Sequence, residues 1–401
     1  MTRLVKRFRR TRVAGNQSRI ALNHPPFFGP VRATRSDMAS DRKIRYAVIG
    51  AGNIAQVAVL PAFAHAKSNS ELVAIISGDG EKRSELAKRY DLELTGSYED
   101  FEHVLREGRI DVVYIATPNE LHKPFALRAA ALGVHVLCEK PLATSVADAE
   151  EIAAACVKAG VELMVAYRLH FEEGTLSAIE LVKSGKIGDP RVFESVFGHT
   201  VRPGDIRTRA DMGGGAMFDL GVYCVNAVRN LFQAEPILTF ASSLMKDDVD
   251  DTTTAFLLFP HGRTAHFTVS NSVAGVSSYR VVGTEGDLRV EPAYEYSDKI
   301  EHHLTVDGKS STTQFGKRDQ FAPELEYFSR CILEGRAPEP DAEEAIDDLH
   351  VIEAILKSAK TGAMVALQPR KRIRRPSLAQ ESSKRAVGKQ ETVNAPSPSL
   401  K

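Results

Sequence analysis

The feature that most constrains this fold is the alternation of continuous apolar runs with helical stretches between residues 44 and 166. The runs are rich in Val, Ile, Leu and Ala and lie at 45–49, 72–76, 112–116, 134–137 and 163–166. Helices are expected between them, at 53–66, 81–90, 101–107, 121–132 and 146–159. Strands that are apolar throughout are buried on both faces, and their alternation with helices favours a parallel sheet. The pattern predicts a doubly wound α/β domain.

The rhythm changes after residue 167, where one expected helix at 176–183 precedes several strands in succession. These strands are expected at 191–197, 237–244, 252–259, 264–270, 278–283 and 287–290, with a hairpin turn at 259–263. Two late helices, at 323–333 and 344–359, close the fold, and Gly362 is the expected cap of the second. We therefore predict a second domain with an antiparallel sheet and a few helices.

The length and the charge distribution indicate two acidic domains between basic ends. A chain of 401 residues suits two domains, which we place at 43–167 and 168–368. The flanking segments 1–42 and 369–401 are basic and polar and are expected to be disordered. Residues 1–40 carry a net charge of +8 and residues 369–401 a net +7, which leaves about −15 on the rest. An acidic body is a poor nucleic-acid binder, so no such partner is expected, although an accessory role of the tails with nucleic acid stays open.

The cysteines and the apolar segments bear on the compartment. The four cysteines are scattered without a Cys-x-x-Cys pair, so neither a metal site nor a disulfide framework is predicted. This favours a reducing compartment. No apolar run approaches the ~20 residues that cross a bilayer, and residues 13–19 are too polar for the core of an export signal. We expect a cytoplasmic protein without a membrane partner, and Met38 is an alternative start.

A glycine motif follows the first strand and opens the first helix. Gly50-Ala51-Gly52-Asn53-Ile54-Ala55 has the pattern Gly-x-Gly-x-x-Ala. Gly50 allows a tight turn, and Gly52 lets the backbone approach a pyrophosphate. The free N–H groups at the helix start, at Asn53 and Ile54, would face the phosphates. In this position the motif predicts a dinucleotide site.

The residues after the second strand bear on the choice of dinucleotide. A carboxylate at the strand end would bind the ribose 2′-hydroxyl of NAD and repel the 2′-phosphate of NADP. Here the strand ends at Ile76 and Ser77 follows, with Lys82 nearby. A hydroxyl and an ammonium favour NADP. Asp79 is the counter-argument, since it could take the acidic role, and NAD therefore stays open.

Two further motifs follow neighbouring strands and are expected at the same rim of the sheet, where ligands bind in open α/β folds. Glu139-Lys140-Pro141 would place an ammonium beside the nicotinamide, where it could stabilise an alkoxide. The other motif is Thr117-Pro118-Asn119, with His122 in the helix that follows. Asn119 could cap that helix. His122 could contact the ribose or nicotinamide, or have only a structural role.

A third motif combines glycines with a carboxylate and a phenol. Gly213-Gly214-Gly215 precedes Asp219 and Tyr223, which share one face if the segment is helical. The glycines would permit close approach to a cofactor. A phenol is a poor acid or base at its ordinary pKa of ~10, and a neighbouring cation such as Lys140 favours its ionised form. Lys140, Asp219 and Tyr223 are therefore the candidate catalytic residues, and no metal is predicted.

In order and spacing, these motifs resemble the glucose-fructose oxidoreductase / inositol dehydrogenase (Gfo/Idh/MocA) family over roughly residues 43–367. The resemblance implies an N-terminal Rossmann domain and a C-terminal α/β domain with a large, mostly antiparallel, open-faced sheet. It implies that Lys140 contacts cofactor and substrate, and that Tyr223 with Asp219 occupies the acid/base position. It also implies that Arg168 and Arg207 line the cofactor crevice, although Ile206 replaces a frequent Trp. A Tyr at the acid/base position resembles the sugar-oxidising branch.

Our hypothesis is therefore reversible hydride transfer between a sugar or sugar-like carbinol carbon and NADP. Tyr223 would exchange the hydroxyl proton, Lys140 would hold the oxygen, and Asp219 would orient Tyr223 or a substrate hydroxyl. The alternative is a catalytically inactive sugar- and dinucleotide-binding regulator of the same fold. The open sheet predicts a homodimer or homotetramer. The lack of an export signal favours an enzyme that exchanges NADP freely.

Overall fold

The computed structural model describes residues 42–296, 298–368, 370, 372 and 374–400. The expected N-terminal tail, with Met38, lies outside the described residues except for Arg42. No helix among the described residues is both long enough and apolar enough to span a membrane.

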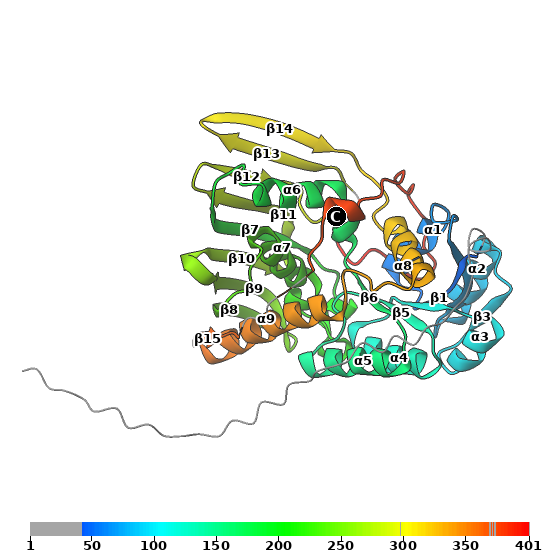
Figure 1. Ribbon diagram of the computed structural model, residues 1–401. Helices are drawn as coiled ribbons and strands as arrows, with labels where there is room; N and C mark the ends of the chain where they lie inside the picture. Colours follow the sequence, from blue (N-terminus) through cyan, green and yellow to red (C-terminus); the bar gives the residue numbers. More distant parts are fainter. Residues whose placement is uncertain (1–41, 297, 369, 371, 373, 401) are drawn as a thin grey trace, which may run out of the picture. The chain divides into compact units, whose positions relative to one another are not determined.

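The first domain contains a six-stranded parallel sheet (Figure 1). Its strands are β1 (Ile44–Ile49), β2 (Ser70–Ile76), β3 (Leu94–Gly96), β4 (Val112–Ile115), β5 (His135–Glu139) and β6 (Leu163–Ala166). Their spatial order is β3-β2-β1-β4-β5-β6, the doubly wound arrangement with its crevice between β1 and β4. Strands β1, β4 and β6 are buried almost throughout, which confirms the interpretation of the continuous apolar runs.

Helices connect these strands as the periodicity predicts. They are α2 (Gly80–Tyr90), α3 (Phe101–Glu107), α4 (His122–Ala131), preceded by the short η2 (Asn119–Leu121), and α5 (Val146–Ala159). The expected helix at 53–66 is wrong in its extent. A π-helical turn, η1 (Ala55–Val59), passes into the short α1 (Leu60–Ala62), and the following residues form a turn. The proline inside this stretch cannot donate a backbone hydrogen bond and sits near the N-terminus of α1.

The second domain contains a nine-stranded sheet in the order β14-β13-β12-β11-β7-β10-β9-β8-β15. The strands are β7 (Pro190–Thr200), β8 (Leu238–Lys246), β9 (Val249–Leu258), β10 (Thr264–Ser270), β11 (Ser272–Gly283), β12 (Gly286–Val290), β13 (Ile300–Val306), β14 (Lys309–Phe315) and β15 (Val365–Ala366). All neighbours are antiparallel except β7 and β10. The predicted hairpin turn joins β9 to β10, while β13 and β14 were missed because polar residues dominate them.

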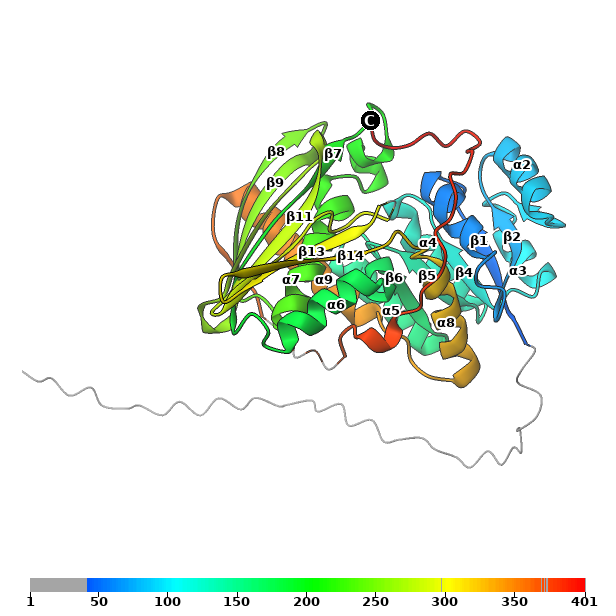
Figure 2. The ribbon, with the colours of Figure 1, turned by 90° about the horizontal axis from the view of Figure 1, so that it is seen from above.

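Four long helices complete the fold: α6 (Glu173–Lys183), α7 (Val222–Phe232), α8 (Ala322–Glu334) and α9 (Ala342–Thr361). Helices α6, α7 and α9 lie on one face of the second sheet, and α8 lies beside β2 of the first domain (Figures 1 and 2). Gly362 ends α9 in the left-handed conformation, with φ of 65°, as expected for its cap. The packing leaves the other face of the second sheet uncovered by any described helix.

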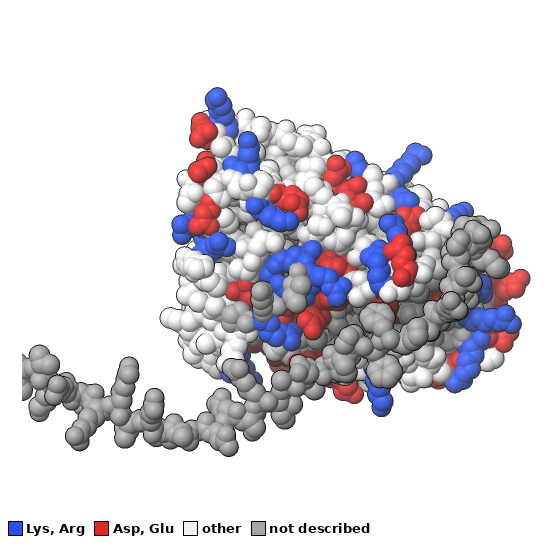
Figure 3. All heavy atoms as spheres, in the orientation of Figure 1, with Lys and Arg blue, Asp and Glu red and all other residues white. Residues whose placement is uncertain are grey.

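The described C-terminal residues do not match the expected disordered tail. Residues 374–400 lie along both domains, with a short turn η8 (Leu378–Gln380) and bridges at Val201–Ser399 and Arg318–Arg385. Arg372 and Arg375 pair with buried Glu344 and Glu235, and Figure 3 shows basic and acidic side chains intermixed on this side. Composition alone does not show such partners, which the acidic body supplies.

Candidate active site

The three candidate catalytic side chains converge. The Lys140 ammonium lies 2.9 Å from the Asp219 carbonyl oxygen, 3.2 Å from its carboxylate Oδ1, and 4.7 Å from the centre of the Tyr223 ring. Lys140 follows β5 at the carboxyl end of the parallel sheet, while Asp219 and Tyr223 belong to the second domain. Lys140 thus shares one site, between the two sheets, with residues that lie 79 and 83 positions further along the chain.

A glycine turn and a π-helix position Asp219. Gly215 has φ of 120°, and a Cβ there would collide with the carboxylate of Asp250. Asp250 accepts a 2.8 Å hydrogen bond from the Met217 N–H and so fixes the start of η6 (Met217–Gly221). Asp219 lies within η6, and Tyr223 follows at the start of α7. A small residue is required at 215 because the carboxylate fills the space a side chain would take.

Opposite charges hold the Asp219 carboxylate ionised. Burial raises its pKa, but Arg207 and Lys140 outweigh that effect, and the net pKa lies well below the ordinary value. Arg207 donates from Nε to Asp219 Oδ2 at 2.6 Å. Burial lowers the pKa of Lys140, yet the charges of Tyr223, Asp219 and Glu139 raise it overall. The ammonium therefore remains protonated and can neutralise a developing oxyanion.

The Tyr223 phenol is held by a second cation. Tyr223 is 8% exposed, and its oxygen accepts a 3.2 Å hydrogen bond from Arg168 Nε. The Arg168 guanidinium also lies 4.9 Å from the ring centre and donates to Gln320 and to the Tyr294 carbonyl. The Asp219 carboxylate contacts Lys140 and Arg207, and no hydrogen bond joins it to the Tyr223 hydroxyl within the described structure. Asp219 thus positions Lys140 rather than the phenol.

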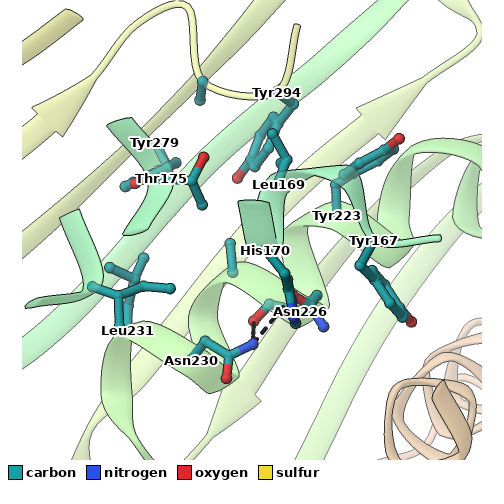
Figure 4. Close-up of a pocket in the computed structure, with 13 residues that line it drawn as sticks. Tyr167, Leu169, His170, Thr175, Tyr223, Asn226, Asn230, Leu231, Tyr279 and Tyr294 are labelled. Atoms are coloured by element: carbon teal, nitrogen blue, oxygen red, sulfur yellow. Dashed lines mark hydrogen bonds between the residues drawn. The ribbon is translucent and has the colours of Figure 1, made fainter. Parts of the chain in front are cut away.

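The cavity behind Tyr223 cannot hold a sugar. Its volume is about 20 Å³, enough for about one water molecule. Figure 4 shows Tyr223 among the residues that line it, with its hydroxyl directed away from Asn226 and Asn230. A substrate must therefore approach the phenol from the opposite side, where Lys140 and Arg168 lie.

The glycine turn after β1 fits a dinucleotide. Gly50 has φ of 95°, and a Cβ there would lie 2.5 Å from the Ala116 carbonyl oxygen, so only glycine fits. A Cβ on Gly52 would meet no described atom within 4 Å, which leaves room for a pyrophosphate above the backbone. Asn53 and Ile54 start the helical turn and are half-buried. The buried Thr117 hydroxyl, two residues after β4, has no hydrogen-bond partner among the described residues.

The loop after β2 has no free carboxylate at the strand end. Asp79 is the N-cap of α2, and its Oδ1 accepts from the N–H groups of Glu81 and Lys82 at 3.0 and 3.1 Å. These bonds lower its pKa. Ser77 is 4% exposed, and Lys82 Nζ lies 3.9 Å from Asp79 Oδ2. The Ser77 hydroxyl accepts from the Asp79 N–H at 3.3 Å, so Ser77, Asp79 and Lys82 form one polar group at the end of β2.

The remaining residues at this rim of the parallel sheet mainly make hydrogen bonds to other protein groups. Pro118 precedes η2, and the Asn119 amide donates to the Gly213 carbonyl at 2.7 Å instead of capping α4, whose N-cap is Leu121. His122 is fully buried, with its ring nitrogens 2.9 and 3.1 Å from the carbonyls of Pro141 and Thr117. Glu139 is also internal and accepts from the Tyr114 hydroxyl at 2.8 Å. Cofactor contacts by these side chains stay predictions.

One residue of the cluster was missed by the motif search. His199, near the end of β7, has a buried Nε2 without a partner among the described residues. Burial lowers its pKa, and the neighbouring charges include Asp219 and Arg207. A single histidine in a strand gives no sequence signal, because only the packing of η6 against β7 brings it near Asp219.

The doubly wound domain, its glycine turn and the amine–carboxylate–phenol cluster define a nicotinamide-dependent oxidoreductase. Two family models match the chain: the oxidoreductase family with an NAD-binding Rossmann fold over residues 44–167, and the GFO/IDH/MocA C-terminal domain over residues 175–289. The chain belongs to the Gfo/Idh/MocA oxidoreductase family.

Relatives of the chain include enzymes named for sugar or aldose substrates. D-xylose 1-dehydrogenase (NADP(+)) from Haloarcula marismortui is 32% identical over 348 residues, which cover 84% of this chain and 96% of the relative. The crystal structure of aldose-aldose oxidoreductase from Caulobacter crescentus, complexed with glycerol, is 36% identical with a TM-score of 0.77. It covers 81% of this chain and 100% of that one. A 3-ketoreductase from Actinomadura kijaniata, complexed with TDP-benzene and NADP, is 27% identical with a TM-score of 0.72, over 79% and 98%.

Proposed function

We propose that this protein is an NADP-dependent oxidoreductase that transfers a hydride between the cofactor and a carbinol or carbonyl carbon of a sugar-like substrate. The observation that carries the proposal is the meeting of Lys140, Asp219 and Tyr223 at the rim of the dinucleotide-binding sheet. NADP-dependent relatives, together with Ser77 and Lys82 beside an engaged Asp79, support NADP over NAD.

The roles follow from the contacts. When bound, NADP accepts or returns the hydride at its nicotinamide. The Lys140 ammonium binds the substrate oxygen and stabilises its negative charge. Tyr223 as the phenolate takes the hydroxyl proton during oxidation, and as the phenol returns it during reduction, with Arg168 fixing its oxygen. Asp219, held by Arg207, keeps Lys140 in place.

Replacing Lys140 tests this mechanism. Lys140→Met should reduce kcat by about 10²–10⁴-fold, because the oxygen loses its charge partner, while NADPH affinity changes little. Turnover is measured by NADPH absorbance across a panel of aldoses and diols, and affinity by NADPH fluorescence. Lys123→Met is the matched control, since Lys123 pairs with Asp148 and Glu151 on the surface. Full activity of Lys140→Met would refute the mechanism. If the unmodified protein binds NADPH but turns over no substrate of the panel, the inactive regulator is favoured instead.

The location and assembly are part of the proposal. Four cysteines, all free and buried, support a cytoplasmic location. The uncovered face of the nine-stranded sheet carries Phe240 and Phe256, which are 45% and 38% exposed and paired across β8 and β9. Such a patch supports assembly of a homodimer through this sheet.

A further inference from the structure

The last ten described residues form a segment that connects the two sides of the cofactor crevice. We call residues 391–400 the C-terminal strap. It follows a stretch anchored beside α8, where Lys384 pairs with Glu326 at 2.8 Å. In Figure 2 the strap runs from the side of β1 and α1 to the end of β7. It is extended, so its contacts are made mainly by its own backbone.

The strap is bound to the glycine turn of the dinucleotide site. The Gln56 side-chain amide pairs with the backbone of Val393 in both directions, accepting from its N–H at 2.7 Å and donating to its carbonyl at 2.9 Å. Asn53, inside the Gly-x-Gly-x-x-Ala motif, donates to the Ala395 carbonyl at 3.0 Å. Gln56 is fully buried and Ala395 is 6% exposed. These bonds lie in a protected environment and are therefore more than surface contacts.

Further contacts attach the strap to the helix beside the 2′-position. The Asn394 amide donates to Glu81 Oε2 at 2.8 Å, and Arg89 donates to the Glu391 carbonyl at 2.6 Å. Both partners are on α2, whose first turn follows Ser77 and Asp79. The strap thus passes along the part of the site where the adenosine half of a dinucleotide binds in this type of sheet.

The end of the strap is bound to the second domain. Arg202 N–H donates to the Pro398 carbonyl, and Leu400 N–H donates to the Thr200 carbonyl, both at 2.8 Å. Val201 and Ser399 form the bridge between these bonds. Thr200 is the last residue of β7, and Val201 and Arg202 lead from it toward Arg207 of the catalytic cluster. One short segment therefore joins the phosphate end of the crevice to its catalytic end.

The strap does not fill the pyrophosphate position. A Cβ built on Gly52 would meet no neighbouring atom within 4 Å, and the strap contacts near this glycine are with the side chains of Asn53 and Gln56. A bound dinucleotide would then lie between the Rossmann backbone and the strap. This geometry suits retention of the cofactor rather than competition with it.

We propose that the C-terminal strap closes over the bound dinucleotide, so that NADP(H) leaves only when the strap detaches and remains bound through successive turnovers. The proposal rests on the function proposed above, because it requires a dinucleotide in this site. It differs from the free exchange of cofactor and the disordered tail that the sequence predicts. The rate of cofactor release thereby depends on the C-terminal sequence as well as on the binding pocket.

The dissociation rate of NADPH tests the strap. The full chain and a chain ending at Gln390 are loaded with NADPH and mixed with excess NADP, and the decay of NADPH fluorescence is followed by stopped flow. Dissociation should be about tenfold or more faster without the strap, because its hydrogen bonds no longer oppose opening. Val393→Pro, which removes the N–H bonded to Gln56, should show a similar acceleration. Lys389→Pro, upstream of the strap, is the matched control and should match the full chain.

Proteolysis of the unmodified chain distinguishes retention of NADPH by the strap from competition between the strap and NADPH. Trypsin cleavage after Lys389 should slow several-fold when NADPH is bound, because the dinucleotide stabilises the closed strap. Faster cleavage with NADPH would mean that strap and cofactor compete, and would overturn the proposal. Equal dissociation rates for all four chains would also overturn it while leaving the dinucleotide site intact. Failure of every chain to bind NADPH would refute the proposed function and the strap together.

Discussion

At the scale of single residues, the loop after β2 shows how a hydrogen-bond pattern assigns a carboxylate to the start of a helix. Asp79 and Lys82 are close neighbours in sequence, and either could have faced the ribose. The structure engages Asp79 with the N-terminus of α2, because an N-cap carboxylate satisfies free N–H groups there. Lys82 is 17% exposed and lies 3.9 Å from Asp79 Oδ2, whereas Lys88 at the other end of the same helix is 71% exposed.

This contrast gives a prediction for cofactor selectivity. Lys82→Met should weaken NADPH binding about tenfold, because one charged hydrogen bond to the 2′-phosphate contributes about 1.5 kcal/mol. NADH has no 2′-phosphate, so its dissociation constant should hardly change. Both constants are measured by fluorescence titration.

Lys88→Met is the matched control on the same helix and should alter neither constant. An equal loss of NADPH and NADH affinity in Lys82→Met would instead indicate damage to α2. Tighter binding of NADH than of NADPH by the unmodified protein would contradict the assignment of the 2′-site.

At the scale of elements, a buried polar network fixes the helix that carries Tyr223. Arg229 on α7 is fully buried and pairs with Glu235, Asp347 and Asp348. Asp348 on α9 also accepts from the Tyr167 hydroxyl at 2.6 Å, at the end of β6. The network therefore joins α7 and α9 to the Rossmann sheet. Removing one member of a buried cluster of a cation and several carboxylates strongly lowers the free energy of unfolding, because the remaining charges stay desolvated.

Arg229→Met should accordingly lower the free energy of unfolding by about 3–5 kcal/mol. Urea denaturation followed by circular dichroism measures the change. Arg191→Met is the matched control, since Arg191 pairs with Asp189 at a half-exposed site and should cost less than about 1 kcal/mol. Similar values for the two variants would show that the buried network adds little to stability.

Elements also show where local patterns stop being informative. The helices at α3 and α5 match the predicted ranges because their periodicity and the cap at Ser145 are local properties. Strands β13 and β14 contain Ser, Thr, Lys and His and have no apolar run. They are strands because β12 offers an edge to pair with. That edge is a product of the whole sheet, so a search of single segments misses it.

At the scale of the whole molecule, the second sheet is covered by helices on one face only. Phe240 and Phe256 lie side by side on the other face, with Val196 and Leu244 also exposed on β7 and β8. Burying such a patch against a second copy would remove apolar surface from water at about 25 cal/mol per Å². This favours assembly through the sheet.

Phe256→Asp should therefore shift the protein toward monomer, with at least about a tenfold weaker self-association, because a carboxylate would be buried in the interface. Light scattering during size-exclusion chromatography gives the mass at several concentrations. Val157→Asp is the control: Val157 is 80% exposed on α5 of the first domain and should leave the mass unchanged. A monomeric unmodified protein would contradict the proposed assembly.

The sequence by itself determined the doubly wound sheet, the glycine turn at residues 50–52 and the motifs that contain Lys140, Asp219 and Tyr223, because these depend on periodicity and local patterns. Tertiary structure decided what those residues touch. It turned Asp219 toward Lys140 and Arg207, added His199, engaged Asp79 as a cap and laid the C-terminal residues along the crevice. The physical reason is that charge and hydrogen-bond partners come from distant segments. The composition of a basic, polar tail therefore predicts disorder, whereas the folded chain supplies acidic and amide partners for it.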